Sequence, residues 1–143
     1  TAERVYGVPV TTDGEITGDV DAVRTDRVRR RLEPADDPSN TIDAPVGQLT
    51  STEYGLGANL SIVSADNGHF VQCDCCDTVL SSGDANWKSH TSVAERPATH
   101  VGSHTSAPDG YVLREFYCPS CGTLFDTEVA HEDDPALISQ VRL

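Results

Sequence analysis

Five cysteines are the residues of this chain best suited to chemistry, and they fall into two short clusters. Cys118 and Cys121 form a C-x-x-C turn followed by a glycine, in the stretch CPSCGTLF. Such a turn lets both thiolates face one ion, and the glycine permits the positive φ angle that the turn requires. The other three cysteines lie in CDCCDTVL, residues 73–80. The spacing therefore predicts a metal site that combines the two clusters.

An internal match between the clusters selects the ligands. When CDCCDTVL is aligned with CPSCGTLF, Cys73 lies opposite Cys118. The same alignment pairs Cys76 with Cys121 and sets Cys75 against a serine, which makes Cys75 a bystander. A register in which Cys75 replaces Cys73 or Cys76 is the alternative. We expect one structural Zn²⁺, bound tetrahedrally and with no open position for a reacting water, on Cys73, Cys76, Cys118 and Cys121.

Two alternatives to a zinc site remain open on these residues. Iron in the same geometry, as in rubredoxin, is the first, because four thiolates accept either ion. The spacer of 41 residues between Cys76 and Cys118, and the lack of a tight aromatic core, favour zinc. A disulfide with spare thiols is the second, and paired C-x-x-C turns at strand ends argue against it. A closed zinc site contributes folding energy and rigid geometry, so we expect a structural role.

The histidines and acidic residues predict no catalytic site. Three histidines, His90, His100 and His104, lie in a segment rich in Ser and Thr, and we interpret them as solvated. The other two are interpreted as structural, and nothing marks Glu115 and Glu128 as an acid and base pair. The sequence contains no phosphate-binding loop, dinucleotide fingerprint, nucleophile elbow or H-E-x-x-H motif.

Strands must position the cysteines, and the second half of the chain supplies them. LSIV and HFVQC flank the reversal signal SADNG, so a β-hairpin is predicted to deliver Cys73. YVLREFYC (111–118) and TLFDTEVA (123–130) predict two strands that meet at the second cysteine pair. The predicted fold class is mainly β: residues 59–143 form a zinc-ribbon-like antiparallel β domain with an insertion at 81–110.

The first half of the chain is predicted to be an arm. DVDAVRTDRVRRRLEP (19–34) predicts a helix with a thin apolar stripe, capped by Asp19 and ended by Pro34. Its arginines form a basic patch, which is either a solvated helix end or a docking surface for an acidic partner. Residues 34–58 are rich in Pro, Gly and small polar residues, which predicts an extended linker ordered by another chain. Residues 1–58 are therefore predicted to be an N-terminal arm, helix and partner-wrapping linker.

Composition and charge narrow the functional classes. The 23 acidic residues outnumber the 10 basic ones, the formal net charge is −13, and neither half is basic, which argues against nucleic acid as a partner. This profile is typical of proteins from salt-adapted archaea, so we expect a halophilic source and infer little about partners from net charge alone. No apolar stretch is long enough to span a membrane and no secretory signal is present, so we expect a cytoplasmic protein.

One stretch carries a family resemblance. YVLREFYCPSCGTLFDTEVA, together with ANWK after the first cysteine cluster, resembles the gamma subunit of acetone carboxylase and of related ketone carboxylases such as acetophenone carboxylase. The resemblance covers roughly residues 70–131. It implies the same four cysteines as zinc ligands, and it carries over Asn86, Trp87 and Lys88.

The resemblance also implies a function. We expect a non-catalytic, structural zinc-binding subunit of an ATP-dependent ketone carboxylase, a ligase complex with large alpha and beta subunits related to hydantoinases and oxoprolinases. ATP and a further divalent metal are expected only in those subunits. The alternative is a free-standing zinc-ribbon module that binds nucleic acid or protein, although the second half has only four cations, Lys88, Arg96, Arg114 and Arg142. A rubredoxin-like electron carrier is the third possibility.

Overall fold

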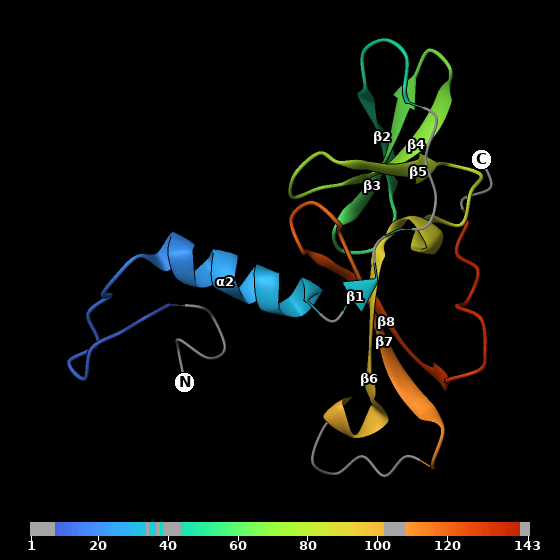
Figure 1. Cartoon of the computed structure of the whole chain (residues 1–143). Coiled ribbons are helices and arrows are strands. Elements are labelled where there is room, and N and C mark those ends of the chain that lie inside the picture. The colour runs from blue at the N-terminus through green and yellow to red at the C-terminus, as the bar shows by residue number, and fades with distance from the viewer. Residues whose placement is uncertain (1–7, 34, 37, 39–43, 102–107, 141–143) are drawn as a thin grey trace.

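The computed structural model describes residues 8–33, 35–36, 38, 44–101 and 108–140. Two antiparallel four-stranded sheets form the body of this part of the chain, and a single long helix projects to one side of them (Figure 1). The mainly β fold predicted from the sequence is confirmed, and the cysteine cluster that joins the sheets is compatible with a zinc ribbon.

The upper sheet in Figure 1 has the strand order β2–β3–β4–β5. Its strands are β2 (Thr50–Gly55), β3 (Leu60–Ala65), β4 (Gly68–Cys73) and β5 (Val79–Ser82). β3 and β4 form the predicted hairpin, in which Ala65 pairs with Gly68 across the turn residues Asp66 and Asn67. The hairpin ends at Cys73, and this is how the upper sheet delivers the first cysteine cluster.

The lower sheet has the order β1–β6–β7–β8. Its strands are β1 (Ala35–Asp36), β6 (Ser92–Pro97), β7 (Tyr111–Tyr117) and β8 (Leu124–His131). β7 and β8 agree with the two strands predicted around the second cysteine pair to within one residue at each end. Each sheet therefore ends one of its hairpins in a C-x-x-C turn.

The core lies where the two sheets meet. Its buried apolar cluster is contributed by both sheets and by the short helix η1 (Trp87–His90), and consists of Leu60, Val71, Leu80, Trp87 and Phe116. Trp87 contacts the rings of Phe116 and Phe125 edge to face, at centroid distances of 6.4 and 6.0 Å. Such aromatic pairs contribute beyond the area they bury.

Two segments differ from what the sequence predicts. Residues 50–55, which we assigned to the linker, form the edge strand β2, and Thr52 donates its hydroxyl to the carbonyl of Ile62 at 2.8 Å. The insertion contains the central strand β6 and, in η1, the core residue Trp87, followed by η2 (Ala98–Val101). Neither segment shows regular alternation of apolar residues, because each is ordered by partners that are distant in the sequence.

The helix α2 spans Val20–Leu32, as predicted. The Asp19 side chain caps it by accepting hydrogen bonds from the backbone N–H groups of Asp21 and Ala22, both at 3.0 Å. None of its residues is fully buried, in keeping with its thin apolar stripe. No helix in the described ranges has the length and hydrophobicity needed to cross a bilayer.

Candidate metal centre

The first cysteine turn is a tight backbone loop that connects β4 to β5. The N–H of Cys73 donates to the carbonyl of Thr78 at 2.9 Å, and the N–H of Asp77 donates back to the carbonyl of Cys73 at 2.9 Å. Asp77 has a φ of +58°, a left-handed conformation that Asp tolerates better than most residues. The side chains of Cys73 and Cys76 therefore leave the loop on the same side.

The second cysteine turn connects β7 to β8 and repeats these bonds. The N–H of Cys118 donates to the carbonyl of Thr123 at 2.8 Å, and the N–H of Gly122 donates to the carbonyl of Cys118 at 2.9 Å. Gly122 has a φ of +66°, close to that of Asp77. The two stretches that align in the sequence, CDCCDTVL and CPSCGTLF, therefore fold into two loops of the same geometry.

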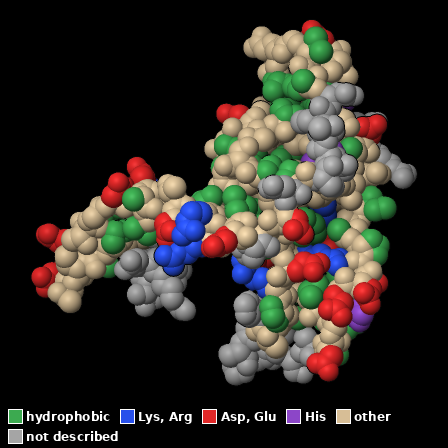
Figure 2. Space-filling view, viewed as in Figure 1, with side chains coloured by type: hydrophobic (Ala, Val, Ile, Leu, Met, Phe, Trp, Pro, Cys, Tyr) green, Lys and Arg blue, Asp and Glu red, His purple; other side chains and the backbone are tan. Residues whose placement is uncertain are grey.

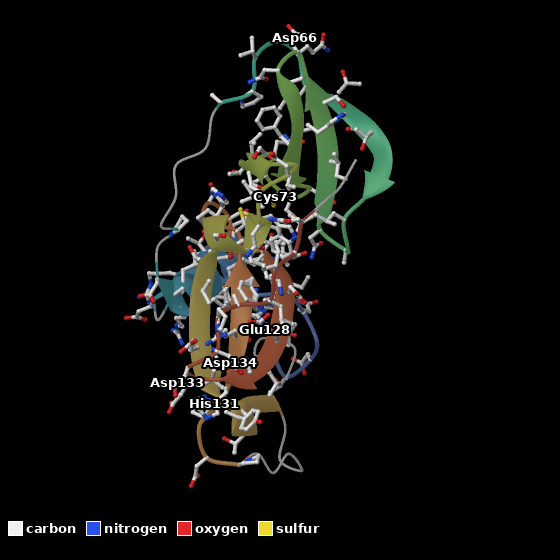
Figure 3. All side chains as sticks on the ribbon, turned by 90° about the vertical axis from the view of Figure 1, so that its right-hand side faces the viewer. Asp66, Cys73, Glu128, His131, Asp133 and Asp134 are labelled. Atoms are coloured by element: carbon white, nitrogen blue, oxygen red, sulfur yellow. The ribbon has the colours of Figure 1, made fainter. Side chains whose placement is uncertain are left out.

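The two turns face each other and bring four sulfur atoms together. The Sγ atoms of Cys73, Cys76, Cys118 and Cys121 all lie within 4.8 Å of one another. Across the two turns, Cys76 Sγ lies 3.6 Å from Cys118 Sγ, and Cys73 Sγ lies 3.8 Å from Cys121 Sγ. Figure 3 shows Cys73 at the junction of the two sheets. Cys75 is exposed and does not belong to the cluster.

These distances fit a tetrahedral metal better than a disulfide. A disulfide requires sulfur atoms about 2 Å apart, and all five thiols are free. Four sulfur atoms placed about 2.3 Å from a central Zn²⁺ lie about 3.8 Å from one another, a spacing that the two cross-turn distances match. The cluster can therefore hold a metal ion that has the thiolate preference of zinc or iron.

Burial and hydrogen bonding divide the four thiols into two pairs. Cys73 and Cys118 are fully buried, and this burial raises the pKa of Cys73 strongly and that of Cys118 to about 11. Cys76 and Cys121 are partly exposed, and each Sγ lies 3.1 Å from the hydroxyl of a threonine two residues later. For Cys76, burial raises the pKa, but hydrogen bonds from Thr78 and neighbouring thiols outweigh it and lower the value to about 7.

Backbone N–H groups complete the surroundings of the buried sulfurs. The N–H groups of Cys75 and Cys76 point at the sulfur of Cys73, and those of Ser120 and Cys121 point at the sulfur of Cys118. Such bonds favour the thiolate, and they orient each ligand from outside the metal's own coordination sphere. The contribution of Cys75 is thus made by its backbone, while its side chain faces solvent.

Asn59 links the two halves of the cluster, a role that the sequence analysis missed. Its side-chain Nδ2 donates to the carbonyl of Leu124 at 3.0 Å, just beyond the second turn. Its own carbonyl accepts from the N–H of Asp74 at 3.0 Å, inside the first turn. An asparagine before a strand is too common a signal to indicate such a bridge, which exists only once both hairpins are folded.

The histidines and Glu115 lie apart from the thiol cluster. His69 Nδ1 lies 3.0 Å from Ser64 Oγ, and His131 stacks edge to face on Tyr111. His90 is partly buried, and its Nδ1 has no hydrogen-bond partner among the described residues. The side chain of His100 and all of His104 lie outside the residues that can be described. Glu115 forms an ion pair with the guanidinium of Arg96.

Lys88 and Glu128 form a buried ion pair beneath the cysteine cluster. The side chains are only 4% and 5% exposed, and Lys88 Nζ lies 3.0 Å from Glu128 Oε2. Lys88 Nζ also contacts Asp126 at 2.7 Å and stands 4.5 Å from the ring centroid of Phe116. Burial by itself lowers the pKa of Lys88, but hydrogen bonds and charge from Asp126 and Glu128 outweigh it and raise the pKa. Arg114 reaches the other oxygen of Glu128 at 3.5 Å.

The neighbours Asn86 and Trp87 hold the C-terminal segment against the body. Trp87 Nε1 donates to Ser139 Oγ at 2.8 Å, and the Ser139 N–H donates to Asn86 Oδ1 at 3.0 Å. The resemblance singled out Asn86, Trp87 and Lys88, and all three are therefore structural contacts of the core.

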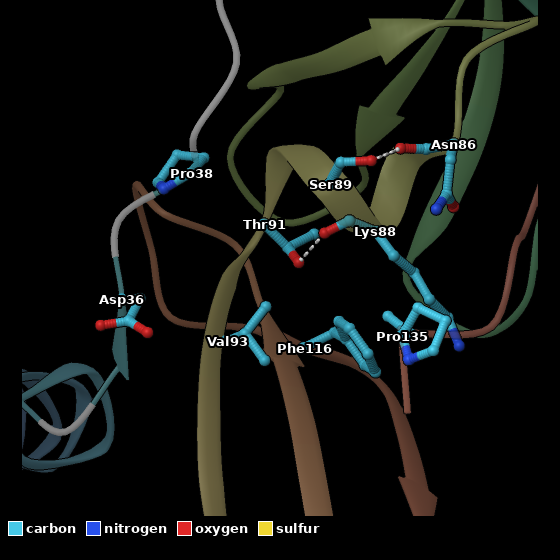
Figure 4. A pocket seen from close by; sticks show the side chains of 10 residues that line it. Asp36, Pro38, Asn86, Lys88, Ser89, Thr91, Val93, Phe116 and Pro135 are labelled. Atoms are coloured by element: carbon cyan, nitrogen blue, oxygen red, sulfur yellow. Dashed lines mark hydrogen bonds between the residues drawn. The ribbon is translucent and has the colours of Figure 1, made fainter. Parts of the chain in front are cut away.

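A pocket of about 480 Å³ lies beside this buried ion pair (Figure 4). Val93 and Phe116 lie between Asp36 on one side of the pocket and Pro135 on the other. The ammonium of Lys88, which also lines the pocket, is bound by the two carboxylates described above. The pocket therefore has a defined shape and an apolar wall. Its lysine already forms structural ion pairs with two carboxylates.

Comparison with known proteins agrees with this architecture. The family model described as acetone carboxylase gamma subunit matches residues 51–139, which is more than half of the 143 residues. The match begins inside β2 and extends to Ser139, so it includes both cysteine turns and the residues that fasten the C-terminal segment. No curated protein matches the chain. The chain belongs to the acetone carboxylase gamma subunit family.

Proposed function

We propose that this chain is a non-catalytic, structural zinc subunit of an ATP-dependent ketone carboxylase complex. It organises large alpha and beta subunits related to hydantoinases and oxoprolinases, and those subunits bind ATP and a further divalent metal. The family match supports membership of such a complex. The observation that carries the structural role is the position of the four-thiol cluster, which joins the only two sheets of the described residues.

The proposed ligands are Cys73, Cys76, Cys118 and Cys121, and the proposed ion is Zn²⁺. A tetrahedral site with four protein ligands leaves no position for substrate or water, so a zinc ion here stabilises the fold and does no chemistry on a substrate. Two pairs of thiols come from two different sheets, and an ion between them fixes the sheets relative to each other. Binding energy at such a site is folding energy.

Partner binding is supported by how little of the first half of the chain is buried. Helix α2 has no fully buried residue, and Val46, Val10 and Ile16 are exposed. We propose that the part of residues 1–58 that precedes β2 acts as an arm and linker that follows the surface of a large subunit, while residues 59–143, with β2 added at one edge, form the zinc-bearing β domain. The division at residue 58 and a cytoplasmic location remain predictions.

Purification of the tagged full-length chain under native salt tests this function. We expect two large chains to co-purify with it and about one zinc per copy of this chain by elemental mass spectrometry. A stable monomer without large partners contradicts the proposed assembly. Iron in place of zinc, with visible charge-transfer absorption, contradicts the proposed ion and favours an electron carrier.

A further inference from the structure

Helix α2 carries an unusual concentration of positive charge. It holds five of the chain's ten cations, namely Arg24, Arg27, Arg29, Arg30 and Arg31. Together with two aspartates, they give α2 a net charge of +3, so the rest of the chain, whose total is −13, carries −16. Figure 2 shows the blue side chains gathered on the part of the helix that adjoins the body.

The described cations outside the helix are all buried or half-buried in ion pairs of the body. Outside α2, the described residues contain three cations, which are Lys88, Arg96 and Arg114. Their side chains are 4%, 28% and 7% exposed, and each forms ion pairs with carboxylates of the body. On the helix, by contrast, the side chains of Arg29 and Arg30 are 62% and 70% exposed. Exposed positive charge in the described ranges is therefore concentrated on α2.

Helix stability alone explains only part of this arrangement. Arg29, Arg30 and Arg31 lie in the last turn, where cations favour the helix dipole. Arg29 and Arg30 also pair with Asp26, at 2.8 and 2.7 Å, as expected for neighbours on one helix. Arg24 lies two turns earlier, where the dipole effect has fallen away.

Arg24 and Arg31 define a basic face of the helix. They are seven residues apart and Arg27 lies between them at helical spacing, so the three share one side of α2. Like charges at this spacing destabilise an isolated helix by a few tenths of a kcal/mol per pair. Arg24 and Arg31 are exposed and form no ion pair within the part of the chain that is described. Arg24 and Arg31 therefore carry positive charge that no carboxylate among the described residues pairs with.

The helix is also placed so that another protein can reach it. Its C-terminal half contacts the second cysteine turn, where Val28 lies against Gly122, while its N-terminal half projects away from both sheets (Figure 1). Arg24 lies on the projecting half of the helix, whereas Arg31 lies in the last turn, on the part that adjoins the body (Figure 1). At 0.15 M ionic strength the field of a charge is screened over about 8 Å, so in dilute salt the arm acts as a local basic surface.

We infer that α2 is a docking arm for a carboxylate-rich patch on a large subunit of the complex. The inference rests on the proposed function, because it needs a partner chain, and charge complementarity selects the chemistry of that partner. A second copy of this chain fits less well, since docking brings together two bodies that each carry −16. A nucleic acid fits less well because its phosphates are evenly spaced along the strand. Phosphates beyond the arm would lie against the acidic body and be repelled by it.

The test compares two double variants of the full-length chain in binding to the purified large subunits. Arg24→Glu with Arg31→Glu reverses the unused charges, and Arg24→Lys with Arg31→Lys keeps them. We expect the dissociation constant at 0.1 M salt to rise about tenfold or more for the Glu variant and to stay near wild type for the Lys variant. At 1 M salt the difference is expected to shrink, because the charges are screened. Circular dichroism and zinc content establish that both variants are folded.

Four results of these measurements would contradict the docking arm or the function on which it rests. Equal affinity of the wild type and the Glu variant at 0.1 M salt overturns the docking arm while leaving the proposed function intact. If no large chain binds the wild type, the proposed function fails and the assigned partner fails with it. A wild-type dimer that the Glu variant loses, measured by sedimentation, overturns the inference in favour of self-association. Duplex DNA binding that only the Glu variant loses overturns it in favour of nucleic acid.

Discussion

Val28 of helix α2 lies directly over Gly122 of the second cysteine turn. A Cβ atom built on Gly122 would come 2.6 Å from Val28 Cγ1, a distance that real Cβ contacts do not show. Gly122 also has a φ of +66°, which disfavours any residue with a side chain. The glycine is thus required both by the turn itself and by the helix packed on it.

Gly122→Ala is expected to destabilise the protein by about 1–3 kcal/mol, from backbone strain and from the clash with Val28. Adding Val28→Ala to Gly122→Ala is expected to restore the stability lost through the clash, while the loss caused by backbone strain remains. Chemical denaturation of the two variants and of Val28→Ala alone measures this coupling. As a matched control at the first turn, Asp77→Gly is expected to be neutral or slightly stabilising, since glycine accepts the left-handed conformation. Additive effects of Gly122→Ala and Val28→Ala contradict the predicted contact.

The three cysteines of the first cluster are expected to respond differently to the same change. Cys75→Ser is expected to keep the full metal content, because its thiol is exposed and outside the cluster. Cys76→Ser and Cys73→Ser are expected to lose metal and unfold the β domain, because each removes one of four ligands. Elemental analysis and circular dichroism of the purified variants give the measurement. Metal loss in Cys75→Ser with retention in Cys76→Ser shows that the assigned register is wrong.

The buried pair of Lys88 and Glu128 is expected to be strongly coupled. Lys88→Met leaves the buried Glu128 carboxylate short of a partner, and we expect a loss of about 3 kcal/mol of stability. Glu128→Gln is expected to cost less, because Asp126 still neutralises the ammonium. Lys88→Met combined with Glu128→Gln is expected to be more stable than the sum of the single changes predicts, and urea unfolding of all four proteins measures it. Strict additivity contradicts the pairing.

Lys88 also gives a prediction for alkaline pH. Its pKa is raised in the folded protein, so its contribution to stability is fully present below the unfolded value of about 10.4. The contribution is lost as the pH rises through the higher folded value. We expect the difference in unfolding free energy between wild type and Lys88→Met to be constant from pH 7 to 9 and to fall above pH 10. A difference that grows with pH in that range contradicts a raised pKa.

Asn59 is expected to affect the metal centre from a distance. Asn59→Ala removes the hydrogen bond to the Leu124 carbonyl, so the two turns lose one of the links that hold them in register. We expect zinc to dissociate to a chelator faster than in wild type, with the zinc content of the untreated protein unchanged. Asn67→Ala is the matched control, because it removes side-chain hydrogen bonds to the backbone of Ala44 and Val46 at the far end of the same hairpin. Equal rates in both variants show that Asn59 does not act on the centre.

The metal cluster is predictable from the sequence because its geometry is local. Each turn is specified by about six consecutive residues, and the match of Cys73 to Cys118 sets the register of both halves. The hairpin and the strands β7 and β8 follow from short apolar patterns beside clear turn residues. Helix α2 follows from its cap and its charge pattern, which are also local signals.

Strands β2 and β6 are not predictable in this way, because their partners are distant in the sequence. β6 has the sequence SVAERP, in which the charges of Glu95 and Arg96 argue for a loop. In the folded chain Glu95 pairs across the sheet with Arg114 at 2.7 Å, and Arg96 pairs with Glu115. The same long-range dependence places Trp87 in the core, although its surroundings in the sequence are polar.

The thiol cluster has a further consequence for the unfolded chain. An ion held by both turns is a crosslink between Cys76 and Cys118, and it closes a loop of 41 intervening residues that contains β5, η1, β6, η2 and all of β7. A covalent crosslink around a loop of this size lowers the entropy of the unfolded chain by an amount worth about 4 kcal/mol. Secreted proteins of similar size obtain such stability from a disulfide. A metal crosslink of this kind supplies it reversibly to a polar chain with a small core, and it works where thiols stay reduced.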